Sequence, residues 1–243
     1  MEERKMKKYI SFYLISLFCT LGLVSNAQET IPFDRFSNGD IIWIVKTGLS
    51  LNNVSGSGVD DAKATWAAQN SYGKYKNTFG GSLSFGLYTP LGSKGPLYIG
   101  SSFAVDKRGF NESIKWKEVS DINAQSTKLN AFMFEIAPCN IGCIANVGEN
   151  IALDFHIGAM FTVDIFGSLK SEIEYLDKPK LSESINIDDV EGYNKYDAAL
   201  LGGIGVWYKH WGVELNYQRG LSSIRKNEDY FSKKILISLG YAF

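Results

Sequence analysis

Hydrophobic side chains alternate with small or polar ones through most of the chain beyond residue 40. Successive side chains of a β-strand leave opposite faces of the pleat, so a period of two predicts strands. Eight segments show this period, at residues 43–51, 79–87, 97–106, 131–136, 151–164, 197–208, 211–218 and 234–243. They approach the length that a tilted strand needs to cross a bilayer.

The two faces of these segments distinguish a membrane barrel from a soluble sheet. One face is bulky and apolar, while the other is rich in Gly, Ser and Ala rather than in Lys, Glu and Thr. Small residues fit the interior of a narrow closed barrel, and the bulky face then contacts lipid. Aromatic residues near the strand ends are typical of an interfacial girdle: Trp43, Phe79, Phe161, Phe166, Tyr208, Trp211 and Tyr241. The pattern predicts an all-β fold, an eight-stranded antiparallel up-and-down transmembrane β-barrel, with ten strands left open.

The connections between the predicted strands alternate in length. Long links at residues 52–76, 106–126, 166–194 and 220–231 alternate with shorter ones at residues 89–96, 138–150 and 209–212. Outer-membrane barrels have long loops outside the cell and short periplasmic turns. This alternation was not used to find the strands, so it supports the barrel independently.

The first 27 residues have the features of a secretory signal peptide. Basic residues precede an apolar run over residues 10–24, and Ser25 and Ala27 stand at the cleavage site. Lipid attachment at Cys19 is disfavoured, because the bulky Phe18 precedes it. We therefore divide the chain into a signal peptide at residues 1–27, a periplasmic lead-in at 28–40 and the outer-membrane barrel at 41–243.

Charge and composition exclude several classes of protein. The chain has 25 Lys and Arg against 26 Asp and Glu, so no basic field points to a nucleic-acid partner. A mean hydropathy of −0.09 fits a barrel, in which only alternate residues need be apolar. The expected partners are outer-membrane lipid, the barrel-assembly machinery during insertion, and an unknown surface or periplasmic partner.

Several ionisable side chains are predicted to point into the lumen of the barrel. An isolated buried charge is too costly, so these residues should form a polar network: Lys46, Glu135, Asp154, His156, Asp197, Glu214 and Lys234. Lys46 and Glu214 lie in the same half of the barrel and are expected to pair. His156 near Asp154 could act as a general base, but we favour a hydrogen-bonded lumen histidine. A charged conduction path is the alternative to a network that plugs the lumen.

Two cysteines and an acidic segment are further candidate sites. Cys139 and Cys143 follow Pro138 in a predicted periplasmic turn, where an oxidising compartment favours a disulfide. The acids of residues 166–194 match no calcium-binding loop and are expected on a solvated surface loop. His156 and His210 are too far apart for a zinc site, so neither a metal nor another cofactor is expected.

The C-terminal segment resembles the insertion signal of bacterial outer-membrane barrels, with the apolar residues Ile235, Ile237, Leu239, Tyr241 and Phe243 at alternate positions. The whole mature chain resembles the PorT-like outer-membrane β-barrel family of Bacteroidota. The resemblance rests on residues 217–224, on the triplet 203–205 and on Pro138, with the two cysteines as a departure. It implies a multi-pass barrel in a Gram-negative outer membrane, and one branch of that family assists protein secretion to the cell surface.

These observations favour a non-enzymatic outer-membrane barrel whose extracellular loops serve binding or scaffolding. The resemblance implies a more specific role, which is assistance to the secretion of proteins to the cell surface. A small channel is one alternative, and it requires ten or more strands or an unfilled lumen. A lipid-modifying barrel enzyme is another, and it needs a polar cluster at the lipid-facing rim that the sequence does not show. A soluble barrel with an apolar internal ligand would point its bulky face inward. Its small residues would then lie on the outside, where the narrow interior that they fit is absent.

Overall fold

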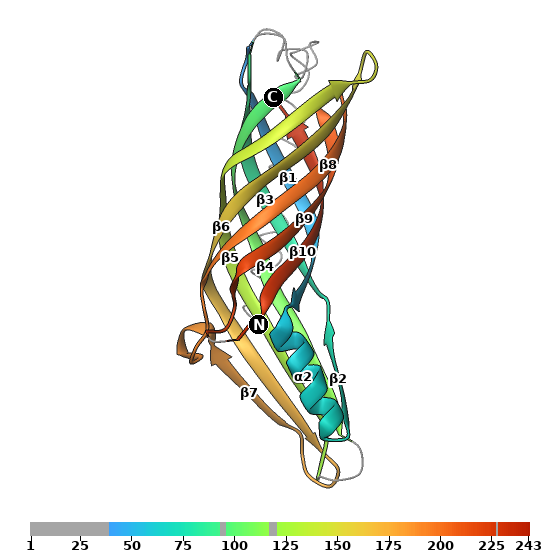
Figure 1. Cartoon of the computed structure of the whole chain (residues 1–243), viewed down its shortest axis with the longest axis vertical. Helices are drawn as coiled ribbons and strands as arrows, with labels where there is room; N and C mark the ends of the chain where they lie inside the picture. Colours follow the sequence, from blue (N-terminus) through green and yellow to red (C-terminus); the bar gives the residue numbers. More distant parts are fainter. Residues whose placement is uncertain (1–38, 93–95, 117–120, 227) are drawn as a thin grey trace, which may run out of the picture. The chain divides into compact units, whose positions relative to one another are not determined.

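The alternating segments form a closed ring of strands in the computed structural model, which describes residues 39–92, 96–116, 121–226 and 228–243. The ring strands are β1 (Ile42–Ser55), β3 (Thr78–Pro90), β4 (Leu97–Trp116), β5 (Ile122–Asn146), β6 (Ile151–Tyr175), β8 (Tyr196–Tyr208), β9 (Trp211–Ser223) and β10 (Phe231–Ala242). Each pairs antiparallel with the next ring strand, and β10 pairs with β1 to close the barrel (Figure 1). The predicted eight-stranded up-and-down barrel is confirmed. The predicted signal peptide lies outside the described residues.

The register of the ladders sets the tilt of the strands. A line of directly opposed residues runs through Phe79, Leu51, Ile235, Tyr217, Gly202, Ile157, Ile141, Ile99 and Thr89. The line leaves β3 at position 79 and returns to it at position 89, a stagger of ten residues. Ten residues span about 33 Å along the strands and eight strands about 38 Å across them, which gives a tilt of about 40°.

The bulky face of every ring strand points outward. Leu49, Phe79 and Ile157 are 73%, 75% and 69% exposed, as lipid-facing residues of a membrane barrel are. Leu201 and Leu236, the two large apolar residues that break the alternation, face the lumen instead. Most of the predicted aromatic girdle is exposed. Tyr241 is an exception, because it is 6% exposed and packs against His210, Trp211 and Phe243.

Short turns gather at one end of the barrel and the long connections at the other. The β5–β6 turn spans residues 147–150 and the β8–β9 turn only residues 209–210. The C-terminus lies at this end too, where the Phe243 amide donates to the Trp43 carbonyl oxygen (Figure 1). By the rule for outer-membrane barrels, this is the periplasmic end.

Pro138 and the two cysteines contradict the predicted turn. Strand β5 continues through Pro138, and its ladder to β6 is irregular between Ile136 and Cys139, where a residue without an N–H is tolerated. Cys139 and Cys143 lie four residues apart on the outer face of this strand, which separates their Cα atoms by roughly 13 Å. A disulfide needs a Cα separation below about 7 Å. Both cysteines are free, so the predicted disulfide is wrong.

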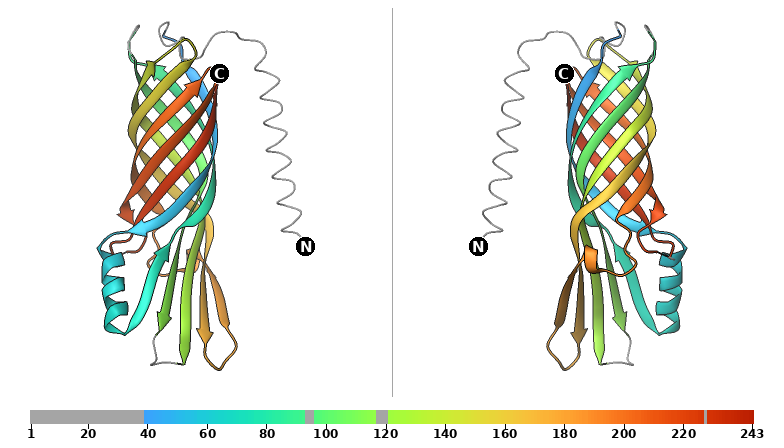
Figure 2. Two further views of the ribbon diagram at one scale, coloured as in Figure 1. Left: turned by 90° about the vertical axis from the view of Figure 1, so that its right-hand side faces the viewer. Right: turned by 90° about the vertical axis from the view of Figure 1, so that its left-hand side faces the viewer.

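The long connections are mostly regular structure rather than irregular loops. Strands β4, β5 and β6 continue beyond the barrel, with β2 (Ser71–Lys76) paired to β4 and β7 (Leu181–Asn186) paired to β6. The helix α2 (Ser57–Ala68) packs on β2, and the short helix η3 (Ile187–Asp189) follows β7. We call β2, β7, α2 and residues 107–116, 122–131 and 167–175 the extension (Figure 2). In the part of the chain described, no helix is long and apolar enough to cross a membrane.

Candidate functional site

The periplasmic end of the lumen is filled by an apolar plug. It consists of eight buried residues: Ile42, Ile44, Tyr88, Tyr98, Ile144, Ala152, Trp207 and Ala242. The rings of Tyr88 and Tyr98 stack with centroids 4.2 Å apart, and Trp207 is fully buried. Gly212 and Gly240 leave the space that the indole occupies, since a Cβ at Gly212 would lie 2.4 Å from the ring. Side chains therefore close this end of the barrel.

A layer of polar contacts lies next to the plug, on the side of the extension. Lys46 Nζ lies 2.7 Å from Glu214 Oε2 and 2.9 Å from the Tyr88 hydroxyl. The Tyr98 hydroxyl donates to Asp154 over 2.7 Å, and the other oxygen of Asp154 lies 3.4 Å from His156 Nδ1. These contacts place four of the residues predicted to face the lumen, from strands β1, β6 and β9, in one layer.

Asn216 joins the two halves of this layer. His156 Nε2 donates to Asn216 Oδ1 over 2.7 Å, and Asn216 Nδ2 donates to Glu214 Oε2 over 3.3 Å. These contacts form a continuous path of hydrogen bonds and ion-pair contacts, and the stacked tyrosines close it into a ring: Tyr98, Asp154, His156, Asn216, Glu214, Lys46 and Tyr88. Each side chain is held by partners from other strands, as a buried polar network requires.

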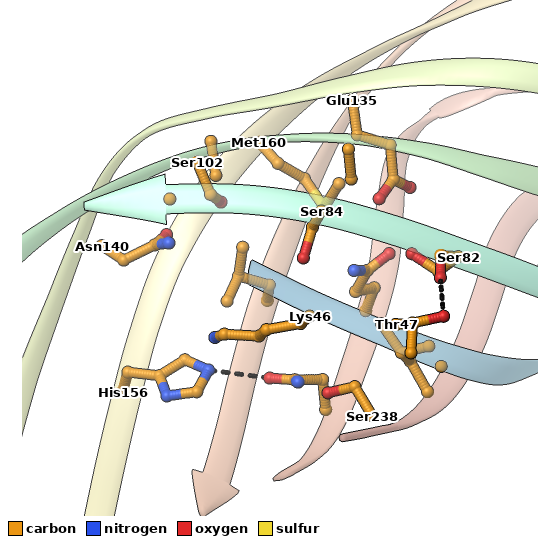
Figure 3. Close-up of a pocket in the computed structure, with 18 of the residues that line it drawn as sticks. Lys46, Thr47, Ser82, Ser84, Ser102, Glu135, Asn140, His156, Met160 and Ser238 are labelled. Atoms are coloured by element: carbon orange, nitrogen blue, oxygen red, sulfur yellow. Dashed lines mark hydrogen bonds between the residues drawn. The ribbon is translucent and has the colours of Figure 1, made fainter. Parts of the chain in front are cut away.

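A cavity of about 70 Å³ lies in the middle of the lumen, between this ring of polar side chains and the extension. Serine side chains and small residues line most of it, with Asn140, His156 and Glu135 at its walls (Figure 3). Asn140 Oδ1 and Ser238 Oγ are buried and have no hydrogen-bond partner among the described residues. A polar cavity of this size has room for several water molecules, and those waters would satisfy both atoms.

Lys234 forms a second ionic layer on the far side of the cavity. Its Nζ lies 2.7 Å from Asp106 and 2.5 Å from Glu135, and all three side chains are buried. Ser50 donates to the other oxygen of Asp106 over 3.3 Å. The layer joins β1, β4, β5 and β10 across the lumen. Sequence reasoning placed Lys234 and Glu135 in the lumen network but omitted Asp106.

Arg108 forms a third ionic layer near the mouth of the barrel. It pairs with Asp164 and, over 3.4 Å, with Asp197, and all three are buried. Sequence reasoning missed Arg108 and Asp164 as site residues, and it ended the third predicted strand at Asp106. The alternation itself continues, since positions 104, 106 and 108 are all buried. Following that period two residues further would have placed Arg108 in the lumen.

An apolar cluster covers the mouth, where the barrel meets the extension. Its buried members are Val54, Val59, Leu129, Ala131, Ile187 and Ile224, with tyrosines and Phe110 packed against them. A small pocket of about 40 Å³ opens among Tyr75, Phe110, Tyr193, Tyr230 and neighbouring residues. The Tyr75 hydroxyl lies 3.2 Å from Glu112, and burial raises the pKa of both side chains. The lumen is thus closed at both ends and polar between them.

The chemistry available in the lumen is limited by this closure. His156 Nε2 donates to Asn216, Nδ1 lies 3.4 Å from Asp154, and the side chain faces the lumen rather than the lipid or the solvent. A general base needs access to the proton that it removes, and the described residues bury His156 between the plug and the Lys234 layer. No three His, Cys, Asp or Glu side chains within the described ranges are grouped so that they could hold a metal ion.

Comparison with known proteins gives a family and several similar folds. The family described as "Outer membrane protein beta-barrel domain" matches residues 26–226. One similar structure is that of Ail from Yersinia pestis in complex with the heparin analogue sucrose octasulfate (15% identity, TM-score 0.35, covering 84% of this chain and 99% of that chain). Another is a major outer membrane protein from Thermus thermophilus (13% identity, TM-score 0.44, 84% and 100% covered). A third is Neisserial surface protein A (11% identity, TM-score 0.36, 83% and 97% covered). No curated protein matches this sequence.

Proposed function

This chain belongs to the family of outer membrane protein beta-barrel domains, and from that premise we propose that it is a non-enzymatic barrel whose extension binds a protein partner at the cell surface. The barrel lies in the bacterial outer membrane. Its lumen is closed by the apolar plug at one end and by the apolar cluster at the other. Among the described residues, the extension is therefore the part that is best placed to meet a partner.

The ordered extension is the observation that carries this proposal. Strands β5 and β6 have 25 residues each, whereas β8 and β9 have 13. About 10 residues suffice to cross the membrane, so the additional residues form a hydrogen-bonded sheet outside it. Closing a barrel requires only loops at this position. A rigid sheet offers a preorganised surface, which reduces the entropy lost on binding.

Strand β7 forms an open edge of that sheet. It pairs with β6 and with no other strand in the described structure, and all six of its residues are exposed. An edge of this kind has unpaired N–H and C=O groups that can accept another strand. The partner that fits best is an extended polypeptide segment that adds to the outer edge of β7.

A photo-crosslinking amino acid at Ser182 on β7 tests this proposal in living cells. We expect a discrete adduct with one surface or secreted protein. The matched control carries the same amino acid at Lys63 on α2, which is exposed on the same extension but lies on a helix. Equal adducts from both positions, or no adduct from Ser182, would contradict binding at the strand edge.

The resemblance to PorT-like proteins adds the finer hypothesis of assistance to surface secretion. An edge that accepts an extended segment is suited to a client chain as it emerges at the surface. Cells that lack this protein should then lose specific proteins from their surface and accumulate them in the periplasm. An unchanged surface proteome would restrict the proposal to binding or scaffolding alone.

A further inference from the structure

Two basic side chains lie side by side on the outer wall of the barrel. Arg219 of β9 and Lys233 of β10 are directly opposed in the antiparallel ladder. Their neighbours in sequence face the lumen, since Gln218 lines the cavity and the Ser232 hydroxyl donates to Asp197. Alternation therefore directs Arg219 and Lys233 outward, toward the lipid.

The surroundings of this basic pair are apolar along β9 and β8. Tyr217 and Leu221 on β9 are 46% and 53% exposed on the same face. Leu200 on β8, which is directly opposed to Arg219, is 54% exposed. Arg219 lies eight residues from Trp211 of the periplasmic girdle, which corresponds to a height of roughly 20 Å for a strand tilted by about 40°. The apolar band of such barrels is about 25 Å tall. The guanidinium can thus reach the headgroup level of the leaflet on the extension side.

Within the described ranges, no carboxylate lies close enough to pair with either cation. Neither Arg219 nor Lys233 forms an ion pair with any described residue. Like charges directly opposed on a sheet destabilise it. This arrangement differs from the lumen, where Lys46, Arg108 and Lys234 are each paired with carboxylates. An anion supplied from outside the chain would remove the repulsion.

We propose that Arg219 and Lys233 bind the phosphate of an anionic lipid headgroup in the leaflet on the extension side. A guanidinium donates two parallel hydrogen bonds to phosphate oxygens, and an ammonium adds a point charge. The apolar side chains that flank the pair contact the acyl chains of the same lipid. This apolar contact favours a lipid over free phosphate as the ligand.

Native mass spectrometry of the purified full chain in detergent tests the site. Phosphatidylglycerol is titrated against the zwitterionic phosphatidylcholine, with the wild type and with R219Q, K233Q and R219Q/K233Q. We expect tighter binding of phosphatidylglycerol to the wild type, and a loss of about tenfold for each cation removed. The control K63Q/K178Q removes the same charge from α2 and from the turn between β6 and β7, and should bind like the wild type.

Each alternative outcome overturns a definite part of the inference. Equal affinity of the wild type and R219Q/K233Q for phosphatidylglycerol, or no preference over phosphatidylcholine, would overturn the site. Displacement of the lipid by millimolar inorganic phosphate would assign the pair to the free anion instead. The shift in gel mobility between unboiled and boiled samples shows that each variant is folded. If the double variant fails to fold, the two single variants decide.

Discussion

Lys234 shows how a charge is accommodated inside the barrel. Its ammonium lies 2.7 Å from Asp106 and 2.5 Å from Glu135, and the side chain is buried. The desolvation of a buried cation is offset only by such close partners from other strands. Removing one member leaves the others buried without compensation, so each residue of the layer depends on the rest.

We expect Lys234→Met to lower the free energy of unfolding by about 3–5 kcal/mol, because it leaves two carboxylates unpaired in the lumen. The triple variant D106N/E135Q/K234M removes the uncompensated charges and should recover most of the loss. Urea unfolding in detergent micelles, monitored by gel mobility, measures the free energy of unfolding of both variants. A single variant as stable as the wild type would show that the ionic layer contributes nothing to stability.

Gly212 is the second position where one residue decides the packing. A Cβ at this position would lie 2.4 Å from the ring of the fully buried Trp207. We expect Gly212→Val to destabilise the barrel by about 1–3 kcal/mol, because the plug has no room for added volume. Gly148→Val is the matched control, since nothing lies within 4 Å of a Cβ at that turn position. Equal thermal unfolding of the two variants would contradict the packed plug.

At the scale of elements, β7 is attached to the rest of the extension by its ladder to β6 and by an ion pair. Glu172 lies 2.6 Å from Lys180, which precedes β7, and 2.6 Å from Lys170 on its own strand. These hydrogen bonds lower the pKa of Glu172 from its ordinary 4.5 to about 2. A depressed carboxylate pKa contributes stability above the unfolded pKa, and that contribution is lost as the pH falls through the folded pKa.

We therefore expect the attachment of β7 to weaken between pH 4.5 and pH 2 and to weaken further at high salt, because the pairs are exposed. NMR chemical shifts of the β7 amides in micelles report the change. Glu172→Gln should show the weakened state already at neutral pH. Glu174→Gln, on the same strand, should keep the wild-type titration. A pH-independent β7 would rule out this attachment.

The elements also show where local patterns fail. Strand faces were predictable, because side-chain direction alternates within any strand whatever its partners. Strand ends were not, since β4, β5 and β6 continue past polar and charged residues that their neighbours in the ladder support. Pro138 looked like the end of a strand. An irregularity in the ladder allows β5 to pass through it and carries both cysteines with it.

At the scale of the whole molecule, packed side chains close the lumen of the barrel. The apolar plug, the three ionic layers of Lys46, Lys234 and Arg108, and the apolar cluster follow one another from the periplasmic end to the mouth. An eight-stranded barrel has an interior just wide enough for such side chains. The middle cavity of about 70 Å³ is enclosed between them.

We expect the protein to give no steady ion conductance when it is reconstituted in a planar lipid bilayer. The reason is the continuous packing of side chains across the lumen rather than any selectivity of charge. A general porin reconstituted in the same way serves as the positive control. Regular conductance steps comparable to those of the porin would overturn the closed lumen and restore the channel alternative.

The sequence by itself determined the class of fold and the face on which Lys46, Glu214 and Lys234 lie, while it left the number of ring strands at eight or ten. These properties follow from a period of two, which is local to each strand. Only the tertiary structure decided which charges meet, because the stagger of ten residues brings Lys234 beside Asp106 and Glu135 from distant strands. It also decided that Cys139 and Cys143 stay apart, and that the long connections form a sheet. Register, closure and edge pairing depend on the partners of a strand, and no single strand contains that information.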